Sequence, residues 1–482
     1  MGPFIAGNAS MRGASSSRSS RQLSGGVIFQ VVCILLCLGP LTSTLAFTQQ
    51  RDPQFISFEE ARAALAKMKS GEAAGLSPNM QPAEWDEWLK KSDAEIRQRL
   101  VIGEEDSLTN LLRFGVTFTR EYRIDDEYLL RYGNSTLVNS FAENRADDLI
   151  KALAAPNENQ GFIEMRAFVE KQGFSLSSAA AKKKLKAYLL ANLSRMQMDL
   201  IEAREHADPN SNQAFQRRGI SLDSNLWPDY DLDLSLQRLV GSGLMQSGQV
   251  NRIAIVGPGL DFVNKQEGVD YYPPQTTQPF AVLDSLLRLG LARPADVRLY
   301  ALDISPRVNL HLENARKNAA RGISYTVQLP WYAGGRWTPE FRGYFTAYWR
   351  GLGAKIGEPV AAIPVPKGSP GFETRAIKIR PEIIERVQPV DMNIVFQRLA
   401  VTPGEQFDLV IGTNIFIYYG PFEQSLARAN IASLLRPGGF LLSNQQLDDA
   451  VPSGLEQVMV VDIPMTDSPV IADHIYCYRR KP

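Results

Sequence analysis

The stretch 407–444, FDLVIGTNIFIYYGPFEQSLARANIASLLRPGGFLLSN, decides the fold of this chain. Residues 407–411 are almost wholly apolar, which is typical of a parallel strand buried on both faces. Apolar residues then recur at helical spacing over 421–435, and Arg-Pro-Gly-Gly ends that helix before a second strand begins at 440. A right-handed crossover between the two strands places loop 412–419 at the carboxyl end of the sheet, where open α/β sheets bind ligands.

Length and composition limit the classes of protein that fit. The 482 residues suffice for two or three domains, and 44% of them are hydrophobic, which suits ordinary cores. Lys plus Arg and Asp plus Glu both total 52, so we expect no nucleic-acid partner. The three histidines are scattered, and Cys477 stands alone outside the N-terminal apolar run, so we expect neither a metal site nor a Cys/His catalytic pair.

The N-terminus has the pattern of an export signal. Residues 1–25 contain arginines and no acid, residues 27–38 form a short apolar core, and Thr44-Leu45-Ala46 resembles a cleavage site. We interpret residues 1–46 as a secretory signal peptide, with an uncleaved signal-anchor as the alternative. Both readings place residues 47 onward outside the cytoplasm, either in the periplasm or secreted. The protein would contact the membrane only through residues 1–46, and only if they stay uncleaved.

Residues 47–245 are predicted to form a mainly α-helical domain. The clearest amphipathic segments span 58–69, 82–100, 146–153 and 178–206. None of them carries residues at catalytic spacing. The acidic run DYDLD at 229–233 lacks the glycine and distal glutamate of a calcium loop, so we interpret it as an exposed linker.

From about residue 246 the sequence alternates between strands and helices, which indicates a parallel sheet. Strand 251–256 leads into Gly257-Pro258-Gly259, and strand 297–302 ends at Asp303. Ser305 then has the position of an N-cap for the following helix. The expected fold is therefore α/β, with a doubly wound and mostly parallel sheet.

The glycines and the acid suggest one ligand. A Gly-x-Gly turn allows close approach of the backbone, and Asp303 is placed to accept hydrogen bonds from two ribose hydroxyls. The long loop 261–279 separates the glycines from the next helix, which argues against a pyrophosphate held at a helix N-terminus. We therefore rank S-adenosyl-L-methionine above a dinucleotide. Two plainer readings stay open, in which the glycines only form a turn and Asp303 caps its own downstream helix.

Residues 246–482 resemble the class I S-adenosylmethionine-dependent methyltransferases. IAIVGPG at 253–259 is similar to their glycine motif, and LYALDIS at 299–305 to the strand that carries the ribose-binding acid. FDLVIGTNIFIYY, followed by LLRPGGFLL, is similar to the chemotaxis-receptor glutamate methyltransferases, and DMNI at 391–394 resembles their adenine-contacting segment. The resemblance implies a seven-stranded sheet whose last two strands, near 457–461 and 474–479, form an antiparallel edge.

The resemblance also implies roles for individual residues. Cofactor contacts are expected from Gly257, Pro258, Gly259, Asp303, Ile304, Asn393 and Thr413. Asn414 and Tyr418 are expected to orient the methyl acceptor, with Tyr419 as a lesser candidate, unless Asn414 and Tyr418 only satisfy loop backbone groups. The sequence departs from the family pattern at three places, where Ile255 replaces an acid, Asp261 a glycine and Thr413 an arginine.

An insertion at about 323–390 replaces a connection that is usually short in the family. Its aromatic stretch 331–349 is expected to form a lid over the carboxyl edge of the sheet. The function hypothesis is methyl transfer from S-adenosylmethionine to an oxygen or nitrogen of an unidentified small-molecule or protein acceptor, with the cofactor site inside 246–482. The alternative is an exported, non-catalytic binding or scaffolding protein that retains the fold.

Overall fold

The computed structural model describes residues 52–68, 76–132, 136–205, 215, 218–261, 270–335, 337–367, 371–447, 453–466 and 472–482. The expected signal peptide or signal-anchor at 1–46 lies outside these residues. Among the described residues, no helix has both the length and the apolar character that crossing a bilayer requires. Residues 51–482 form one compact unit.

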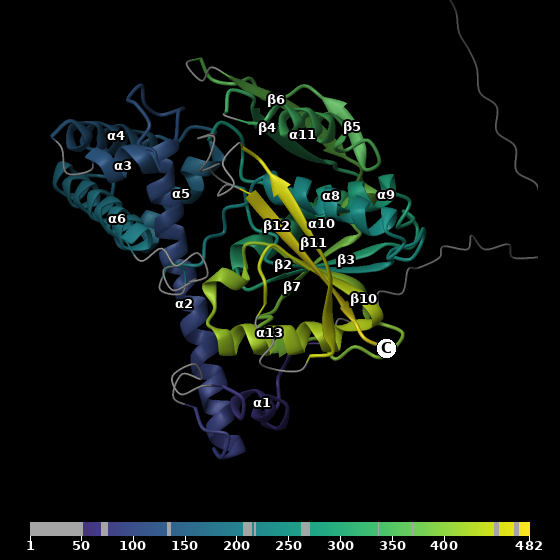
Figure 1. The fold of residues 1–482 in the computed structure, drawn as a ribbon. Helices are drawn as coiled ribbons and strands as arrows, with labels where there is room; N and C mark the ends of the chain where they lie inside the picture. The colour runs from purple at the N-terminus through teal and green to yellow at the C-terminus, as the bar shows by residue number, and fades with distance from the viewer. Residues whose placement is uncertain are drawn as a thin grey trace, which may run out of the picture. The chain divides into compact units, whose positions relative to one another are not determined.

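A mainly helical region comes first in the chain (Figure 1). Its elements are β1 (Gln54–Phe55), α1 (Phe58–Leu65), α2 (Pro82–Phe114), α3 (Asp126–Tyr132), α4 (Thr136–Ala154), α5 (Gln160–Lys171), α6 (Ala179–Glu205) and α8 (Trp227–Gly241). Helix α2 is 33 residues long, and at its start the Glu84 carboxylate accepts a 2.7 Å hydrogen bond from the backbone of Gln81. Its second half packs with α4, α5 and α6 around a separate apolar core, so α2 connects that bundle to the rest of the unit.

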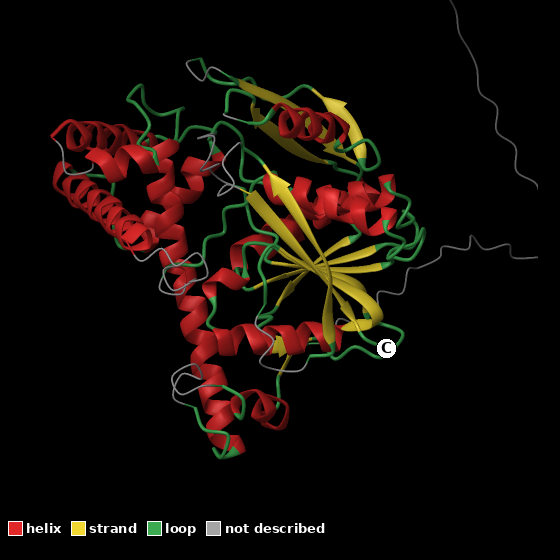
Figure 2. Cartoon of the chain, viewed as in Figure 1, coloured by secondary structure: helices red, strands yellow, loops and turns green. Residues whose placement is uncertain are grey.

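The centre of the unit is a seven-stranded, mostly parallel sheet, as predicted (Figure 2). Its strands are β2 (Arg252–Val256), β3 (Arg298–Asp303), β7 (Val387–Asp391), β9 (Phe407–Gly412), β10 (Leu435–Ser443), β11 (Leu455–Pro464) and β12 (Ala472–Arg480). They lie in the order β11-β12-β10-β9-β2-β3-β7. β12 runs antiparallel to β10 and to β11, and the other neighbouring strands pair in parallel, which confirms the predicted antiparallel edge.

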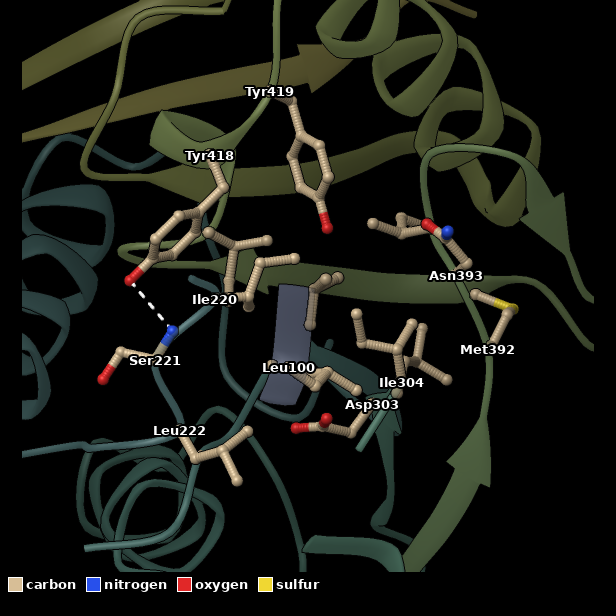
Figure 3. Close-up of a pocket in the computed structure, with 16 residues that line it drawn as sticks. Leu100, Ile220, Ser221, Leu222, Asp303, Ile304, Met392, Asn393, Tyr418 and Tyr419 are labelled. Carbon is tan, nitrogen blue, oxygen red and sulfur yellow. Dashed lines mark hydrogen bonds between the residues drawn. The ribbon is translucent and has the colours of Figure 1, made fainter. Parts of the chain in front are cut away.

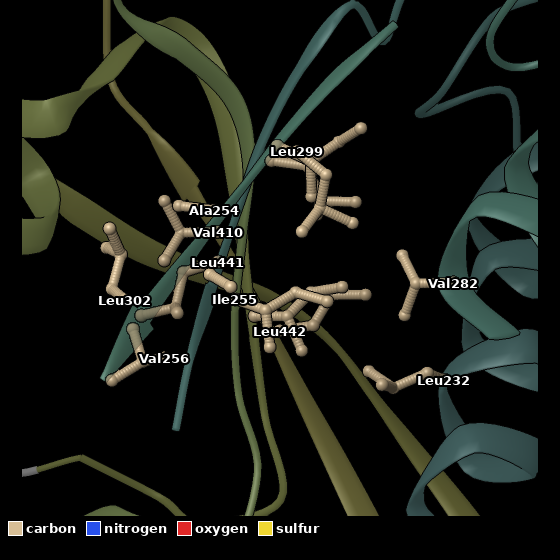
Figure 4. Packing of buried hydrophobic residues seen from close by; sticks show 14 of the residues in the cluster. Leu232, Ala254, Ile255, Val256, Val282, Leu299, Leu302, Val410, Leu441 and Leu442 are labelled. Atoms are coloured by element: carbon tan, nitrogen blue, oxygen red, sulfur yellow. The ribbon is translucent and has the colours of Figure 1, made fainter. Parts of the chain in front are cut away.

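Helices cover both faces of this sheet, which makes it doubly wound. Helices α8, α9 (Gln278–Arg288) and α10 (Pro306–Ala319) lie on one side in Figure 1, and α13 (Pro421–Leu434) lies on the other. Side chains alternate between the faces along each strand, so Ile255 points toward Val282 of α9 while Ala254 points away (Figure 4). Ile255 is fully buried, because both faces of its strand are covered.

The strand order fixes where a ligand binds. From β2 the chain steps outward through β3 to β7, and it then returns to place β9 on the other side of β2. The connections therefore leave a crevice between the carboxyl ends of β2 and β9, the switch point at which such sheets bind ligands.

The insertion folds as a second, antiparallel sheet. It contains β4 (Tyr325–Tyr332), α11 (Pro339–Gly351), β5 (Gly357–Val360) and β6 (Phe372–Ile379), with the strands in the order β4-β6-β5. Three short elements complete the described chain, namely α12 (Pro381–Ile384), β8 (Gln397–Arg398), which pairs with β1, and the 3-10 turn η1 (Phe416–Tyr418).

The prediction that residues 331–349 form an aromatic lid is wrong. Trp331 and Phe345 are 1% exposed, and their rings lie 5.5 and 4.5 Å from the ring of Trp227 in α8. No described residue of 331–349 is among those that line the cleft at the carboxyl edge of the sheet. The aromatic rings instead pack against one another between the insertion and α8. Burying their large apolar surface away from water stabilises the folded protein.

The prediction that residues 229–233 form an exposed acidic linker is also wrong. These residues form the first turns of α8, and Asp229, Asp231 and Asp233 are at most 2% exposed. The helix packs against α9 on one side and against β11 and β12 on another, so its polar positions are covered as well as its leucines. Asp233 pairs with Arg288 of α9, and burial raises the pKa of Asp229 and Asp231 well above the ordinary range.

Candidate functional site

A cleft opens at the switch point of the sheet (Figure 3). It encloses about 470 Å³ of empty space, including the open solvent at its mouth. The lining residues come from the ends of β2, β3 and β7, from the loop after β9, and from two segments far earlier in the chain. They are Leu100, Ile220, Ser221, Leu222, Val256, Gly257, Gly259, Leu302, Asp303, Ile304, Met392, Asn393, Ile394, Ile415, Tyr418 and Tyr419.

The glycine turn forms one wall of the cleft. Gly257 and Gly259 have φ of 62° and 72°, which side chains rarely tolerate. A Cβ on Gly257 would collide with the side chain of Ile415, and a Cβ on Gly259 would lie 2.8 Å from the carbonyl oxygen of Leu222. Both positions therefore require glycine for conformation and for space.

Asp261, which stands where the family has a third glycine, holds this turn in place. Its buried carboxylate accepts hydrogen bonds from the Tyr272 hydroxyl at 3.0 Å and from the Gln275 amide at 3.1 Å. Its backbone also pairs with that of Gln275 in an isolated bridge. Burial raises the pKa of Asp261 to about 7, although both side-chain hydrogen bonds oppose that change.

Asp303 lies beside the glycine turn, at the end of β3. It is 6% exposed, and its carboxylate accepts a 2.7 Å hydrogen bond from the backbone of Ser305. Burial raises the pKa of Asp303 to about 7, against the backbone hydrogen bonds from Ser305 and Gly259. Ser305 caps α10 itself, since its hydroxyl accepts from the backbone of Val308, so the cap does not depend on Asp303.

Helix α2 supplies part of the cleft that the sequence did not reveal. Leu100 lies in the middle of the opening in Figure 3. One helical turn earlier, the Arg97 guanidinium donates to the Ile304 carbonyl at 3.2 Å and pairs with Asp391 at 2.8 Å. The expectation that residues 246–482 contain the whole site is therefore wrong, because α2 closes it from outside that range.

The segment 218–222 completes the wall beside α2. A Cβ on Gly103, in the middle of α2, would collide with the carbonyl of Ile220, and one on Gly219 would collide with the backbone of Gly103. The two backbones touch, and Ile220 and Leu222 reach the cleft as a result. A glycine inside a helix signals such a close approach, so Gly103 was the available clue in the sequence.

Arg99 fixes this segment against the loop after β9. Its guanidinium donates to the backbone carbonyls of Tyr418 at 2.9 Å, Arg218 at 3.0 Å and Phe215 at 3.0 Å. Burial lowers the pKa of Arg99. One half-buried cation thus holds three chain segments together at the edge of the cleft.

Two tyrosines after β9 face the cleft. The Tyr418 hydroxyl accepts a hydrogen bond from the backbone of Ser221 at 3.4 Å, which Figure 3 marks with a dashed line. The Tyr419 hydroxyl points into the cleft and has no hydrogen-bond partner among the residues that the structure describes. Burial raises the pKa of Tyr419, so this hydroxyl stays protonated at neutral pH and can donate a hydrogen bond.

The structure brings seven predicted residues together at the cleft: Gly257, Gly259, Asp303, Ile304, Asn393, Tyr418 and the lesser candidate Tyr419. Pro258, Thr413 and Asn414 are not among the lining residues. Thr413 accepts a 3.0 Å hydrogen bond from Gln278. The Asn414 backbone donates to the Asn444 side chain at 2.8 Å, and the exposed Asn414 side chain accepts from the Asn444 side chain at 2.6 Å. These contacts join Asn414 to a neighbouring side chain and not to loop backbone groups.

The cleft has the chemistry of a nucleoside site. Its walls are mostly apolar, one buried carboxylate lines it, and one backbone turn approaches it closely with two glycines, which have no Cβ atoms. A carboxylate in such a place accepts hydrogen bonds from vicinal hydroxyls, and apolar walls suit a flat base. Over the described residues, no group of three or more His, Cys, Asp or Glu side chains is arranged to hold a metal ion.

Comparison with known proteins gives likenesses in structure alone. No protein-family model and no curated protein matches the sequence. Solved structures similar to this one include magnesium protoporphyrin IX methyltransferase (ChlM) from Synechocystis PCC 6803 with bound SAM, at 12% identity over 53% of this chain and 80% of that chain, with a TM-score of 0.26.

Two more of the similar structures are also of methyltransferases. N-methyltransferase NodS from Bradyrhizobium japonicum WM9, in complex with S-adenosyl-L-homocysteine, is 14% identical over 57% of this chain and 100% of that chain, with a TM-score of 0.27. The CcbJ methyltransferase from Streptomyces caelestis is 13% identical over 52% of this chain and 95% of that chain, with a TM-score of 0.25. The finer resemblance to chemotaxis-receptor enzymes stays a prediction.

Proposed function

We propose that the chain binds S-adenosyl-L-methionine in this cleft and transfers its methyl group to an oxygen or nitrogen of an acceptor. The observation that carries the proposal is that Asp303 and the Gly257–Gly259 turn lie side by side in the wall of one cleft at the switch point of the sheet. That arrangement joins a carboxylate for ribose hydroxyls to a backbone cradle with no room for side chains.

The residues present fit this cofactor. Asp303 would accept the ribose hydroxyls, and Ile304 and Met392 would pack against the adenine. Asn393 lines the same end, but its side-chain amide already donates to Asp93 at 2.7 Å. The positive-φ glycine turn would accommodate the amino-acid end of the ligand, since a Cβ at either glycine would fill part of that space or displace the wall.

In the reaction, the chain would align the acceptor with the methyl group and exclude water from the cleft. When bound, S-adenosylmethionine supplies an electrophilic methyl group on a sulfonium. Displacement at that carbon needs an acceptor held in line, so no nucleophilic side chain is required. Leu100, Ile220 and Leu222 cover the cleft from the side of α2 and keep water out. The protonated hydroxyl of Tyr419 would orient the acceptor atom, as Tyr418 would at the rim.

Calorimetry with S-adenosylhomocysteine on the full chain tests the proposal. We expect binding, and we expect Asp303→Ala to weaken it by about 1.5 to 3 kcal/mol because a charge-assisted hydrogen bond is lost. Asp462→Ala is the control, since Asp462 is 72% exposed and pairs only with His474 on the far edge of the sheet among the described contacts. An unsubstituted chain that binds no S-adenosylhomocysteine would refute the proposal.

The non-catalytic alternative predicts a different result. A scaffolding protein that retains the fold needs no methyl donor, so it would show no S-adenosylhomocysteine binding. A glycine motif with a residue other than glycine at its third position favours this alternative only if the turn needs that glycine. The contacts of Asp261 with Tyr272 and Gln275 hold the turn without it. The altered motif is therefore compatible with a formed cofactor site.

A further inference from the structure

Two buried residues just before α9 connect the insertion to the glycine turn. Gln275 and Thr276 are 2% and 0% exposed, and neither of them lines the cleft. Both form hydrogen bonds with β4, the first strand of the insertion, and with the turn at 257–261. Any effect that they have on a ligand in the cleft therefore passes through the turn.

Thr276 bonds in both directions. Its backbone N–H donates to the Tyr325 hydroxyl of β4 at 2.9 Å, and its own hydroxyl donates to the Gly259 carbonyl at 3.0 Å. The Tyr325 hydroxyl also lies 2.8 Å from Nε2 of His311 in α10. Burial lowers the pKa of His311 to about 4, so its ring is neutral at neutral pH and can accept the Tyr325 proton. Tyr325 is thereby fixed in its turn.

Gln275 makes a second link beside the first. Its side chain accepts from the Gln328 backbone of β4 at 2.8 Å and donates to the Gln328 carbonyl at 2.7 Å. The same side-chain amide donates to the Asp261 carboxylate at 3.1 Å. Two backbone hydrogen bonds, of 2.6 and 3.0 Å, also join Gln275 to Asp261. Strand β4 therefore supports the turn at two positions, Gly259 and Asp261.

Gly259 is the point at which these contacts reach the cleft. It lines the cleft with φ of 72°, and as a glycine it has no side chain to restrict its conformation. Its carbonyl is held by Thr276, and the N–H of the next residue, Leu260, donates to the Leu222 carbonyl at 2.7 Å. Burial raises the pKa of Asp303, and the Gly259 N–H, which faces that carboxylate, opposes the rise. The contacts of Thr276 therefore act on the geometry at Asp303.

We propose that β4 of the insertion positions the cofactor-binding turn, with Thr276 and Tyr325 as positioning residues. The inference rests on the proposed function. Tyr325 holds Thr276, Thr276 holds Gly259, and Gly259 directs its N–H toward the carboxylate of Asp303 that would bind the ribose. The insertion is thereby part of the cofactor site, although none of its described residues lines the cleft.

Calorimetry with S-adenosylhomocysteine on variants of the full chain tests this role. Thr276→Val removes the hydroxyl, Thr276→Ser retains it, and Tyr325→Phe removes the acceptor of the Thr276 N–H. Thr276→Val and Tyr325→Phe should weaken binding by about three- to tenfold, the effect of one neutral hydrogen bond. Thr276→Ser should bind like the unsubstituted chain, as should Tyr344→Phe, an exposed position in the insertion. Unchanged affinity in both Thr276→Val and Tyr325→Phe would overturn the proposal.

Phe341→Leu separates positioning from a general loss of stability. Phe341 is 3% exposed in α11 of the insertion, and its ring lies 5.4 Å from that of Trp227 in α8. Shortening this buried side chain should lower the midpoint of thermal unfolding but leave the affinity for S-adenosylhomocysteine unchanged. If Phe341→Leu weakened binding as much as Thr276→Val, destabilisation would explain both results and the positioning role would be overturned.

The pH profile of binding is a readout that destabilisation alone would not move. Besides the backbone N–H groups of Ser305 and Gly259, the groups that act on the Asp303 carboxylate are Asp391 of β7, Arg97 of α2 and the hydroxyl of Tyr419. None of them is changed in these variants. A displaced Gly259 N–H stabilises the carboxylate less, so the midpoint of the affinity profile should rise by about half a pH unit in Thr276→Val. A midpoint that stays in place would overturn the link from β4 to Asp303.

Hydrogen exchange on the unsubstituted chain tests the same link without any substitution, so it applies even if the variants fail to fold. S-adenosylhomocysteine should slow the exchange of the Thr276 amide hydrogen as well as those of the glycine turn. Protection of the turn without protection of Thr276 would overturn the inference and leave the cofactor site standing. Absence of S-adenosylhomocysteine binding by the unsubstituted chain would refute the proposed function and, with it, this inference.

Discussion

The side-chain amide of Asn393 donates a 2.7 Å hydrogen bond to the carboxylate of Asp93, which lies 300 residues earlier in the chain. Asp93 also pairs with Arg97 at 3.0 Å, one turn along the same helix, and Arg97 contacts the ends of β3 and β7. Burial lowers the pKa of Arg97, but its hydrogen bond to Asp391 and its interactions with Asp93 raise it overall. Helix α2 and the cleft therefore form one structural unit.

Substitution at Asp93 tests that coupling. Asp93→Ala removes the acceptor for a buried amide and one partner of Arg97, so we expect the free energy of unfolding to fall by about 1 to 3 kcal/mol. The affinity for S-adenosylhomocysteine should fall in parallel, because Asn393 lines the cleft. Denaturant titration and calorimetry measure the two quantities. Asp86→Ala, an exposed position on the same helix, serves as the control, and equal behaviour of the two variants would contradict the coupling.

Alanine in the glycine turn should abolish cofactor binding. Gly257→Ala introduces strain of about 1 kcal/mol from the positive φ and a collision with Ile415. Gly243→Ala is a matched control, since Gly243 has φ of 75° with nothing near its Cβ position. Both variants should lose stability, but only Gly257→Ala should lose affinity for S-adenosylhomocysteine by calorimetry. Equal affinity of Gly257→Ala and Gly243→Ala for S-adenosylhomocysteine would contradict a role of the turn in binding.

The pKa of Asp303 predicts a pH dependence with a definite sign. The folded-state pKa is about 7 and the ordinary value is 3.8, so between these pH values the folded protein holds a proton that the unfolded chain has released. This group therefore lowers the free energy of unfolding as pH rises from about 4 to 7. Asp303→Asn should remove that slope, measured as the difference from the unsubstituted chain in denaturant titrations at several pH values.

Cofactor affinity should change with pH in the opposite direction. The ionised carboxylate of Asp303 accepts hydroxyl hydrogen bonds better than the protonated form, and its ionised fraction rises about tenfold between pH 6 and pH 8. The affinity for S-adenosylhomocysteine should therefore rise up to about tenfold over the same range. Calorimetry with Asp303→Asn, which should show a flat profile, is the control, and a flat profile in the unsubstituted chain would contradict the assignment.

The stability of a Trp331 variant tests whether the aromatic stretch 331–349 is part of a packed core or a mobile lid. Trp331 is 1% exposed, and its indole packs against Trp227 and Phe345, so Trp331→Ala should lower the free energy of unfolding by about 3 to 5 kcal/mol. Tyr344→Ala is the control, since Tyr344 on α11 is 68% exposed. Thermal denaturation of both variants checks the expectation. A Trp331→Ala protein of unchanged stability would restore the idea of a mobile lid.

The proposed export signal gives a prediction about location. Residues 1–25 carry arginines and no acids ahead of the short apolar core, so we expect mature protein that begins at Phe47 and accumulates outside the cytoplasm. Cell fractionation followed by N-terminal sequencing measures both. Soluble cytoplasmic protein with an intact Met1 would refute export, whereas a membrane-bound protein with an intact N-terminus would indicate the signal-anchor.

The sequence by itself determined the sheet and the ends of its strands. Strands β2, β3 and β9 follow from short apolar runs, and the glycine turn and Asp303 follow directly after two of them. Such features are local in the chain, because alternation, turn residues and caps act over a few positions. Parallel strands then bring their carboxyl ends to one edge, so Gly257 and Asp303 were predictable as neighbours.

Only the tertiary structure decided which segments cover the carboxyl edge of the sheet and which side chains are buried. Leu100 lines the cleft and Asp93 contacts the lining residue Asn393, although both precede the sheet by more than 100 positions. No local period in the sequence encodes a contact at that distance. Asp231 and Trp331 show the same limit, since a carboxylate in the sequence suggests exposure and an aromatic cluster suggests a surface. Burial depends on which elements pack against a residue, and that is settled only when distant segments meet.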